Sequence, residues 1–395
     1  MKKKLRILYI SSVVPNTSCG SSIAIYRHLV YKSDFEVSYC SYFTENSETE
    51  YNYTIPTSRI RKRVQNTRFS RLIWNVTYLL NWHFLPKKLY RYTKHYNPDA
   101  ILTVPDNVYG GIAYQLARKL KIPLVVDFQD LFPYSQFTSI QIRPFKPIQK
   151  FLINKFRLLN HKASLAFYTS EGMRDFFNFK NNGFVLYPIG DFNRPKIEGD
   201  KYTPVIKGRF KIIYAGNCYG AYGRMLLKLT NHIIESKNSQ IQLEIYPAGI
   251  DWPEKDIETA KKHHVLQDFT PFEELKKRLI EADGFLTVMS FEKLEKPFVQ
   301  TSFTTKWLDY APYGKPIFVW GPEYSSAVKF AKKYDCGIII SSDSSKEVFN
   351  QFTATSSNLE TIVHYGIQAR KVSDEVLNPE NIHKLFVDEI NKLGK

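Results

Sequence analysis

Cysteine is scarce in this chain of 395 residues, and no two cysteines lie close together in the sequence. The four are Cys19, Cys40, Cys218 and Cys336. Their spacing argues against a disulfide framework and against a zinc site, and it suits a reducing cytoplasm. Asp-x-Asp triplets are absent too, and the pair His263-His264 has no third ligand near it. We therefore expect no bound metal, because a metal site needs several converging ligands.

A long apolar run is also missing. The longest apolar stretch, residues 72–86, contains two asparagines and is shorter than the ~20 residues that a membrane-spanning helix needs. The run from Leu5 to Val14 is short, is interrupted by serines and lacks the small-residue cleavage site of an export signal. We therefore expect no transmembrane helix, and we interpret Leu5 to Val14 as a buried first strand.

Negative charge is absent from two long stretches, within a chain whose formal net charge is +17. No Asp or Glu lies between Tyr51 and Pro98, where aromatic residues alternate with ten Lys and Arg in the segment 59–94. Acids are absent again from Leu131 to Ser170, where the segment 143–162 contains six Lys and Arg. Such a surface attracts a polyanion. Anionic lipid and nucleic acid are both candidates, and a solvated basic face without a partner is the third interpretation.

What the sequence does have is an alternation of strand and helix patterns from end to end. In the first half, we expect strands at 5–14, 35–42, 99–104, 123–128, 164–169 and 183–187. Helices are expected between them, at 21–32, 70–95, 107–121, 146–162 and 171–179. Apolar, β-branched runs such as IPLVVDF are typical of parallel strands that are covered on both faces. The pattern predicts an α/β fold with a doubly wound, Rossmann-like sheet.

A second series follows a stretch rich in proline and glycine at 187–208. Its strands are expected at 210–215, 241–247, 264–268, 284–289, 316–320 and 336–341, and its helices at 223–236, 254–263, 271–281, 302–312 and 324–334. This predicts two Rossmann-like domains, 1–190 and 209–375, joined by a linker at 191–208. We expect the final helix, within 376–395, to pack back onto the first domain. Two such domains facing each other leave a cleft at the carboxyl ends of both sheets, where ligands bind in such folds.

Five segments then follow one another in a specific order: ILYISSVVPNTSCGSSIAIYRHL, VVDFQDLFP, FYTSEGMRDFF with VLYPIGDFNRP, IIYAGNCYGAYGRMLLKL, and TTKWLDYAPYGKPI. In this order they resemble the GT-B glycosyltransferases, and within them the family-four group of retaining enzymes. The second segment is similar to the D-L-W-P loop of that family, and the last to its K-L-x-E-Y-x-x-x-G-K-P segment. The resemblance spans most of the chain and implies the GT-B architecture, with the nucleotide held by the carboxyl-terminal domain and the acceptor by the amino-terminal domain.

The resemblance also implies an activity. A member of this group moves a sugar from a nucleotide diphosphate sugar to a glycan or a lipid-linked acceptor, with retention and without a metal or another cofactor. In the family, the loop at Gly20 faces the leaving phosphate. The residues allow this, because a helix start favours a negatively charged group, but a plain helix cap at Ser21 or Ser22 fits equally well.

The glycines of the fourth segment are Gly216, Gly220 and Gly223, and they permit a close approach of backbone to phosphate. Many relatives have Arg after the first glycine and Lys before the last, whereas this chain has Asn217 and Tyr222 there. We expect Gly216, Asn217, Gly220 and Gly223 to contact the donor. The cations that a diphosphate needs must come from elsewhere.

Two cations are the candidates for the diphosphate. The resembling subgroup has a lysine at the position of Lys306, and Arg224 opens the helix after the glycine loop. The alternative for Lys306 is an exposed helix lysine. The resemblance assigns Asp309 to the ribose hydroxyls, since a carboxylate can accept two hydrogen bonds.

One expected glutamate is missing. Eight positions before Asp309, the first glutamate of the family's paired motif is replaced by Thr301. Glu292 and Glu295 lie near enough in the sequence to substitute for it, although no spacing requires this.

Polar residues also follow the predicted strand 123–128. We expect Asp127, Gln129 and Asp130 to bind the acceptor, because a carboxylate at a strand end can bind sugar hydroxyls or orient the acceptor nucleophile. Loop capping is the alternative. Gln129 stands where many family members have a histidine, and a glutamine cannot carry a proton. We expect Asp130, together with Lys306 and Arg224, to be catalytic.

The basic segments 59–94 and 143–162 predict attachment to an anionic membrane surface, and hence a cytoplasmic enzyme bound peripherally to the inner face of the membrane. On the predicted helix 146–162, an apolar stripe is either core or interfacial: Ile148, Phe151, Leu152, Phe156 and Leu159. Two rival functions remain. A nucleotide-sugar epimerase of the same fold leaves the basic surface without a role, and a nucleic-acid binder lacks any recognisable motif.

Overall fold

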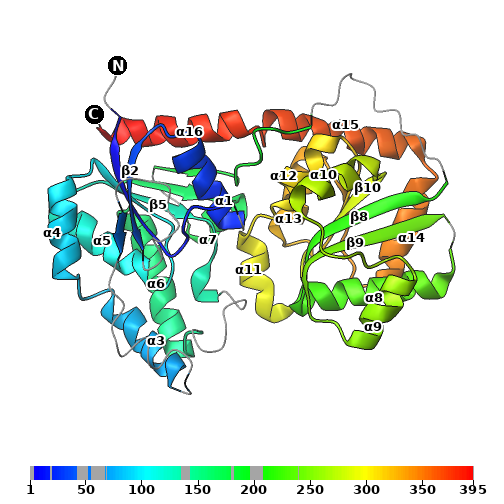
Figure 1. Cartoon of the computed structure of the whole chain (residues 1–395), viewed down its shortest axis with the longest axis horizontal. Coiled ribbons are helices and arrows are strands. Elements are labelled where there is room, and N and C mark those ends of the chain that lie inside the picture. Colours follow the sequence, from blue (N-terminus) through cyan, green and yellow to red (C-terminus); the bar gives the residue numbers. More distant parts are fainter. Residues whose placement is uncertain are drawn as a thin grey trace. The chain divides into compact units, whose positions relative to one another are not determined.

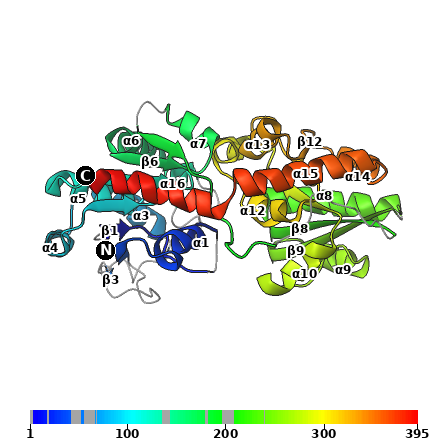
Figure 2. The same cartoon turned by 90° about the horizontal axis from the view of Figure 1, so that it is seen from above.

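The computed structural model describes residues 4–17, 20–41, 52–54, 67, 69–134, 143–178, 182–195, 208–238 and 240–394. The chain divides into two compact units. Unit 1 comprises Met1–Ile189, Thr301–Phe303 and Pro379–Lys395, and unit 2 comprises Gly190–Gln300 and Thr304–Asn378. Each unit is built on one parallel sheet with helices packed around it (Figure 1 and Figure 2).

In its described residues, unit 1 has a seven-stranded sheet with the order β3-β2-β1-β4-β5-β6-β7. The strands are β1 (Arg6–Ile10), β2 (Glu36–Ser41), β3 (Asn52–Thr54), β4 (Ala100–Thr103), β5 (Leu124–Phe128), β6 (Leu165–Tyr168) and β7 (Gly183–Val185). All neighbours pair in parallel. The order reverses between β1 and β4, which places a topological switch point at the carboxyl ends of these two strands.

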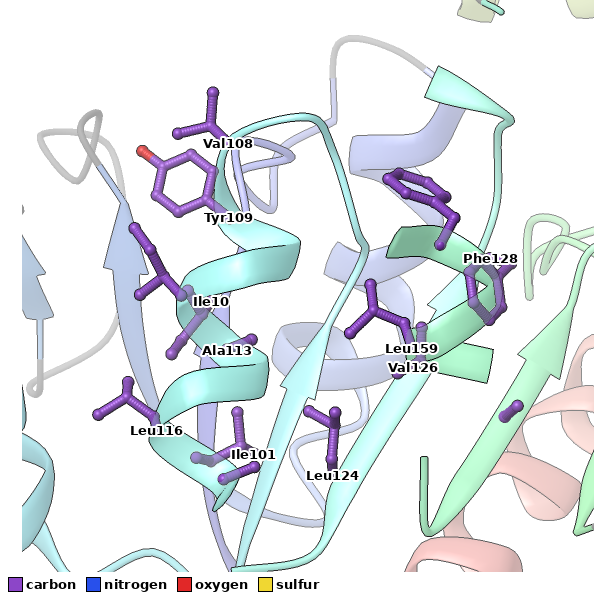
Figure 3. Close-up of a cluster of buried hydrophobic side chains, with 14 of the residues drawn as sticks. Ile10, Ile101, Val108, Tyr109, Ala113, Leu116, Leu124, Val126, Phe128 and Leu159 are labelled. Carbon is purple, nitrogen blue, oxygen red and sulfur yellow. The ribbon is translucent and has the colours of Figure 1, made fainter. Parts of the chain in front are cut away.

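The helices of unit 1 bury the sheet. They are α1 (Gly20–Tyr26), η1 (Arg27–Tyr31), α3 (Ser70–Leu80), α4 (Lys87–Tyr96), α5 (Tyr109–Leu120), η2 (Phe132–Tyr134), α6 (Lys146–Lys162), α7 (Glu171–Phe176), α16 (Pro379–Asn391) and η5 (Lys392–Gly394). Strands β4, β5 and β6 are buried at every position. Figure 3 shows part of the core, in which Ala113 and Leu116 of α5 belong to one cluster with Ile101 of β4 and Val126 of β5.

The carboxyl-terminal helix α16 is part of unit 1. The ring of Phe386 contacts the rings of His28, Phe35 and Phe167. His383 lies 3.1 Å from His28 between their Nδ1 atoms, and its Nε2 lies 2.7 Å from a carboxylate oxygen of Asp34. The first and the last described segments of the chain therefore belong to the same unit.

Unit 2 has a five-stranded parallel sheet in its described residues, with the order β12-β11-β10-β8-β9. The strands are β8 (Phe210–Cys218), β9 (Ile241–Ile250), β10 (Gly284–Val288), β11 (Ile317–Trp320) and β12 (Ile338–Ile340). The helices are α8 (Gly220–Ser236), α9 (Glu254–Lys262), α10 (Phe272–Glu281), η3 (Lys293–Glu295), α11 (Lys296–Thr301), α12 (Lys306–Tyr310), η4 (Ala311–Tyr313), α13 (Ser326–Tyr334), α14 (Ser345–Ser356) and α15 (Leu359–Glu375). Here the order reverses at β8 and β10, so the second switch point lies at their carboxyl ends.

The predicted α/β fold with two doubly wound sheets is confirmed, and two local predictions are wrong. The expected helix 70–95 is two helices, because Pro86 lacks an N–H and α4 begins directly after it. The expected strand 264–268 is a single bridge between Ile245 and Leu266. Of the two interpretations of the apolar stripe of α6, the structure favours core, since Leu152, Phe156 and Leu159 are fully buried in unit 1.

Several predictions concern residues outside the described part of the chain. These are Cys19, most of the linker 191–208, and the basic residues Arg59, Arg61, Lys62, Arg63 and Arg68. The other cysteines, Cys40, Cys218 and Cys336, are buried and free. Among the described helices, none combines the length and the apolar composition that crossing a membrane requires.

Candidate functional site

The glycine loop of unit 2 lies at the switch point, between β8 and α8. Gly216 has a φ of +147° and Gly220 a φ of +60°, which are conformations that favour glycine. A Cβ atom on Gly216 would lie 2.5 Å from the Nζ atom of Lys306. A Cβ atom on Gly223 would clash with the carbonyl oxygen of Cys218. The loop therefore needs glycine at 216 for the approach of a lysine and at 223 for the packing of α8.

Lys306 supplies the cation that the loop itself lacks. It is the first residue of α12, and its Nζ atom lies 4.8 Å from the ring centroid of Tyr214 on β8. The backbone N–H of Ala215 donates to the hydroxyl of Tyr310 at 2.8 Å, which holds α12 against β8. Burial lowers the pKa of Lys306, and the nearby Asp309 opposes this effect. An ammonium group that is partly stripped of water, beside a glycine backbone, is suited to pair with an anion.

Asp309 is exposed on the same short helix as Lys306. Its charge acts on Lys306 and raises the pKa of the buried Tyr310, after the larger effect of burial. The structure thus brings Gly216, Lys306 and Asp309 into one region of unit 2.

Arg224 forms an ion pair with Glu292 in this structure. Its guanidinium donates to Glu292 Oε1 from Nε at 3.1 Å and also from Nη2. Glu292 follows β10, so this ion pair joins the loops after the two strands that flank the switch point. Both side chains are about half exposed, and such pairs contribute little to stability. Sequence reasoning found both residues but not their contact.

Glu295 lies in the same group and is buried. Burial raises the pKa of its carboxyl group and the charge of Glu292 adds to this, whereas the hydroxyl of Ser290 and the charge of Arg224 oppose it. Its Oε2 atom makes no hydrogen bond in the described structure. Glu295 is therefore a half-satisfied carboxyl group beside the switch point.

Asp251 is a member of this site that the sequence did not reveal. It follows β9, and its Oδ2 atom accepts a hydrogen bond of 2.9 Å from the backbone N–H of Gly220. While this bond is formed, the backbone N–H of Gly220, the first of α8, cannot donate to a phosphate. Asn217 is exposed, and its carbonyl oxygen accepts a hydrogen bond of 2.7 Å from the hydroxyl of Tyr214. A search for Asp at strand ends would have found Asp251.

In unit 1, the predicted acceptor residues lie at the carboxyl end of β5: Asp127 is in the strand, and Gln129 and Asp130 follow it. Asp127 is 3% exposed, and burial raises its pKa to about 7. The amide of Gln129 donates to Asp127 Oδ2 at 2.7 Å, while Gln129 Oε1 makes no hydrogen bond. Asp130 is half-buried, and burial raises its pKa to about 6, with a hydrogen bond from Ser302 opposing. Both carboxyl groups can therefore change protonation near neutral pH.

Sequence reasoning missed a third carboxyl group at this edge. Asp106 follows β4, is buried, and accepts hydrogen bonds from the backbone N–H groups of Ser12, Val108 and Tyr109. These bonds fix the start of α5 and the loop after β1, and burial raises the pKa of Asp106. The rule that selected Asp127, a carboxylate at the end of a buried strand, selects Asp106 equally well. The adjacent Asn107 is buried, and its Oδ1 atom has no hydrogen-bond partner in the described residues.

Comparisons with known proteins identify the architecture. No protein-family model and no curated protein matches the chain. Among solved structures, HepE from Anabaena, in complex with UDP and glucose, is 11% identical with a TM-score of 0.65, over 98% of this chain and 100% of HepE. A glycosyltransferase from Rickettsia africae ESF-5 is 13% identical, and sucrose-phosphate synthase from Thermosynechococcus elongatus is 12% identical. Each of the two has a TM-score of 0.65 over 99% of both chains.

The chain has the GT-B fold. At these identities the likeness shows the fold alone, so the functions of the individual residues are proposals. Gly20 is the first residue of a seven-residue helix, and the residues just before it, 18–19, lie outside the described part. Thr301 is buried in unit 1, where its carbonyl oxygen accepts a hydrogen bond of 2.5 Å from the hydroxyl of Ser170.

No group of three or more His, Cys, Asp or Glu has the arrangement of a metal site in the described part of this GT-B chain. His263 and His264 lie just after α9 and are exposed. The polar groups of the site are thus lysine, arginine, carboxyl and amide groups.

Proposed function

We propose that the protein is a glycosyltransferase that moves a sugar from a nucleotide diphosphate sugar to a hydroxyl group of a glycan or lipid-linked acceptor. The observation that carries the proposal is the approach of Lys306 Nζ to the backbone of Gly216 at the switch point of unit 2. A diphosphate carries the charge that this ammonium group and glycine backbone can bind. HepE, which has the same fold, is described in complex with UDP and glucose, and this supports a nucleotide donor.

The chemistry follows from the groups present. The bond between the anomeric carbon of the sugar and the diphosphate oxygen breaks, and its electron pair leaves with the diphosphate. Lys306 stabilises the charge that develops on the leaving group, which is the main contribution that a fixed cation can make. The acceptor hydroxyl forms the new bond to the anomeric carbon, and its proton passes to an oxygen of the leaving diphosphate. Retention of configuration and independence of metal rest on the resemblance to the family-four enzymes.

The remaining residues have supporting roles in this proposal. Asp309 binds the ribose hydroxyls, and the backbone at Gly20, Gly216 and Asn217 contacts the donor. The glycines at 220 and 223 shape the loop. Arg224 joins the diphosphate by exchanging its exposed partner Glu292, which requires little free energy. Asp127, Gln129 and Asp130 bind and orient the acceptor.

The acceptor class and the location are proposed from charge. Helices α3, α4 and α6 contain no Asp or Glu, and they carry most of the described lysines and arginines of the segments 59–94 and 143–162. A positive surface without acids favours an anionic leaflet. We therefore place the enzyme on the inner face of the membrane, in the synthesis of a cell-surface polysaccharide or glycolipid.

The donor proposal is tested by ligand binding. A thermal-shift screen of UDP-, GDP-, dTDP- and CMP-sugars identifies the donor, because a ligand at 100 times its Kd stabilises the folded state by about 2.7 kcal/mol. The variant Lys306→Ala is expected to weaken that donor at least ten-fold while it remains folded. Lys329→Ala, which removes an exposed lysine of α13 in the same unit, is the matched control and is expected to bind normally. Equal affinity of Lys306→Ala and the wild type would move the diphosphate site elsewhere.

A further inference from the structure

Helix α3 presents one row of apolar residues to solvent, while Tyr78 and Trp74 on its other side pack in the core of unit 1. Its buried residues are Ser70, Asn75 and Tyr78. Five large apolar residues in and beside the helix are exposed: Phe69 by 51%, Leu72 by 53%, Val76 by 46%, Leu80 by 46%, and Phe84, just after the helix, by 67%. We call Phe69, Leu72, Val76, Leu80 and Phe84 the α3 row. A helix on the surface of a globular protein normally turns such an apolar row toward the core.

The row is continuous, which separates it from ordinary surface apolar residues. Its members in and before the helix are three or four positions apart, so they lie on one face of α3. Single exposed apolar side chains are common and need no explanation. A contiguous group of large ones marks a surface that binds something apolar.

Hydrogen bonds on the opposite face hold the row outward. The side-chain amide of Asn75 donates to the carbonyl oxygen of Arg143 at 3.2 Å, and its oxygen accepts from the backbone N–H of Phe145 at 2.7 Å. Arg71 Nε donates to the same Arg143 carbonyl at 3.0 Å, and its guanidinium lies over the ring of Phe145. These bonds join α3 to the segment before α6, beside which it lies in Figure 1. Rotating the helix to bury the row would leave these polar groups unpaired.

The charge of α3, of α4, which follows it in the chain, and of α6, which contacts it, selects the partner of the row. Helices α3, α4 and α6 contain no carboxylate, and several of their cations are exposed: Lys87, Lys88, Arg91, Lys94, Lys146 and Lys150. A second copy of this chain would bring the same positive charge against itself. A nucleic acid binds through its phosphates and bases, so it would not bury an aliphatic and aromatic row of this kind. An anionic lipid leaflet matches both features, since it accepts apolar side chains below a negatively charged surface.

We propose that α3 is the membrane-docking helix of this protein and that the α3 row enters an anionic leaflet. Helix α3 would thus be the part of the protein that enters the membrane proposed above as its location. The purpose of this docking, access to a lipid-linked acceptor, rests on the proposed function. Its physical basis, the outward apolar row in a basic surface, is independent of sugar transfer.

Vesicle binding tests the proposal. Co-sedimentation of the full chain is measured with vesicles of phosphatidylcholine alone and of phosphatidylcholine with phosphatidylglycerol at about 3:1. We expect binding to the mixed vesicles and at least ten-fold weaker binding of the triple variant Leu72→Ser, Val76→Ser, Leu80→Ser. The matched control is Phe269→Ser, Ile280→Ser, Leu359→Ser in unit 2, which removes side chains that are 71%, 62% and 59% exposed and leaves the charge unchanged. The control triple is expected to bind within two-fold of the wild type.

Insertion is measured directly with an environment-sensitive dye. In a Cys19→Ser background, the dye is attached at Val76→Cys or, as the control, at Phe269→Cys; the remaining cysteines are buried. Mixed vesicles should shift the emission to the blue at position 76 and leave it unchanged at 269. Both triple variants should keep the thermal shift by the donor, so that loss of docking is separated from loss of donor binding.

Several outcomes would overturn the proposal. These are no binding of the wild type to mixed vesicles, equal binding of the α3 triple variant, or binding without an emission change at position 76. A wild-type dimer that the α3 triple variant abolishes would assign the row to a second copy of the chain instead.

Discussion

Asp127 shows how burial of a single residue couples stability to pH. Its ordinary pKa is 3.8, and burial raises the pKa to about 7 in the folded protein. Between these values the folded state keeps a proton that the unfolded state has lost. The contribution of Asp127 to stability is therefore most favourable below pH ~4, falls as the pH rises through this window, and changes no further above about pH 7.

The variant Asp127→Asn removes this titration and keeps an oxygen that can accept the hydrogen bond from Gln129. We expect its stability relative to the wild type to be greater at pH 8 than at pH 4.5 by about 2 to 3 kcal/mol. Urea unfolding at the two pH values measures this difference. Asp343→Asn, at an exposed carboxylate of unit 2, is the control and should show no such difference. A pH-independent effect of Asp127→Asn would mean that the carboxyl group ionises as easily in the folded protein as in the unfolded chain.

The two candidate cations, Lys306 and Arg224, differ in burial and in their contacts. Lys306 is half-buried and lies against Gly216, whereas Arg224 is exposed and bound to Glu292. A buried charge that loses its partner costs much more than an exposed one. The larger share of the diphosphate interaction therefore belongs to Lys306 in our proposal, and Arg224 is a secondary contact.

At the scale of elements, Ser170 does two jobs at the start of α7. Its hydroxyl oxygen accepts from the backbone N–H of Met173 at 3.0 Å and donates to the carbonyl oxygen of Thr301 at 2.5 Å. The first bond is a helix cap, and the second fixes the segment Thr301–Phe303 within unit 1.

We expect Ser170→Ala to lower the free energy of unfolding by about 2 kcal/mol, the sum of a cap and a buried hydrogen bond. Ser325→Ala is the matched control, because Ser325 is also buried and caps α13 with only the corresponding bond to Val328. Its cost should be about 1 kcal/mol. Denaturant unfolding of both variants compares them, and equal costs would show that the bond to Thr301 contributes nothing.

The elements also show what the sequence can and cannot predict. Buried parallel strands such as β4 and β5 were predictable, because continuous apolar runs have few other uses. The direction of α3 was not, since its apolar spacing alone indicates a core-facing helix. Its orientation depends on contacts with residues far away in the sequence, such as those of Asn75 with Arg143 and Phe145, about 70 positions away.

The candidate site divides in the same way. The glycine loop and Lys306 were expected from their resemblance to a family pattern. The partner of Arg224 and the bond from Gly220 to Asp251 join residues from different strand ends, whose pairing depends on the strand order β10-β8-β9. Asp106 could have been predicted, because it lies just beyond the carboxyl end of β4, and Asp127 lies near the carboxyl end of β5.

At the scale of the whole molecule, the chain leaves unit 1, forms unit 2 and returns to unit 1 as α16. Phe386 of this helix is fully buried against His28, Phe35 and Phe167. Burial, together with the neighbouring His383, lowers the pKa of His28, so this contact is made by a neutral ring at physiological pH. Helix α16 therefore contributes to the core of unit 1.

This order of the chain predicts separate responses of the two units. Phe386→Ala is expected to cost unit 1 about 3 to 5 kcal/mol, as for other buried phenylalanines. Phe352→Ala makes the same change in the core of unit 2, where Phe352 is fully buried against Phe318.

In scanning calorimetry with and without the donor, Phe352→Ala should lower the transition that the donor raises, because the proposed donor residues lie in unit 2. Phe386→Ala should lower the other transition and leave the donor-sensitive one in place. If both variants shift a single common transition, the units unfold together, and the segment Thr301–Phe303, which belongs to unit 1 but interrupts the sequence of unit 2, is the first connection to examine.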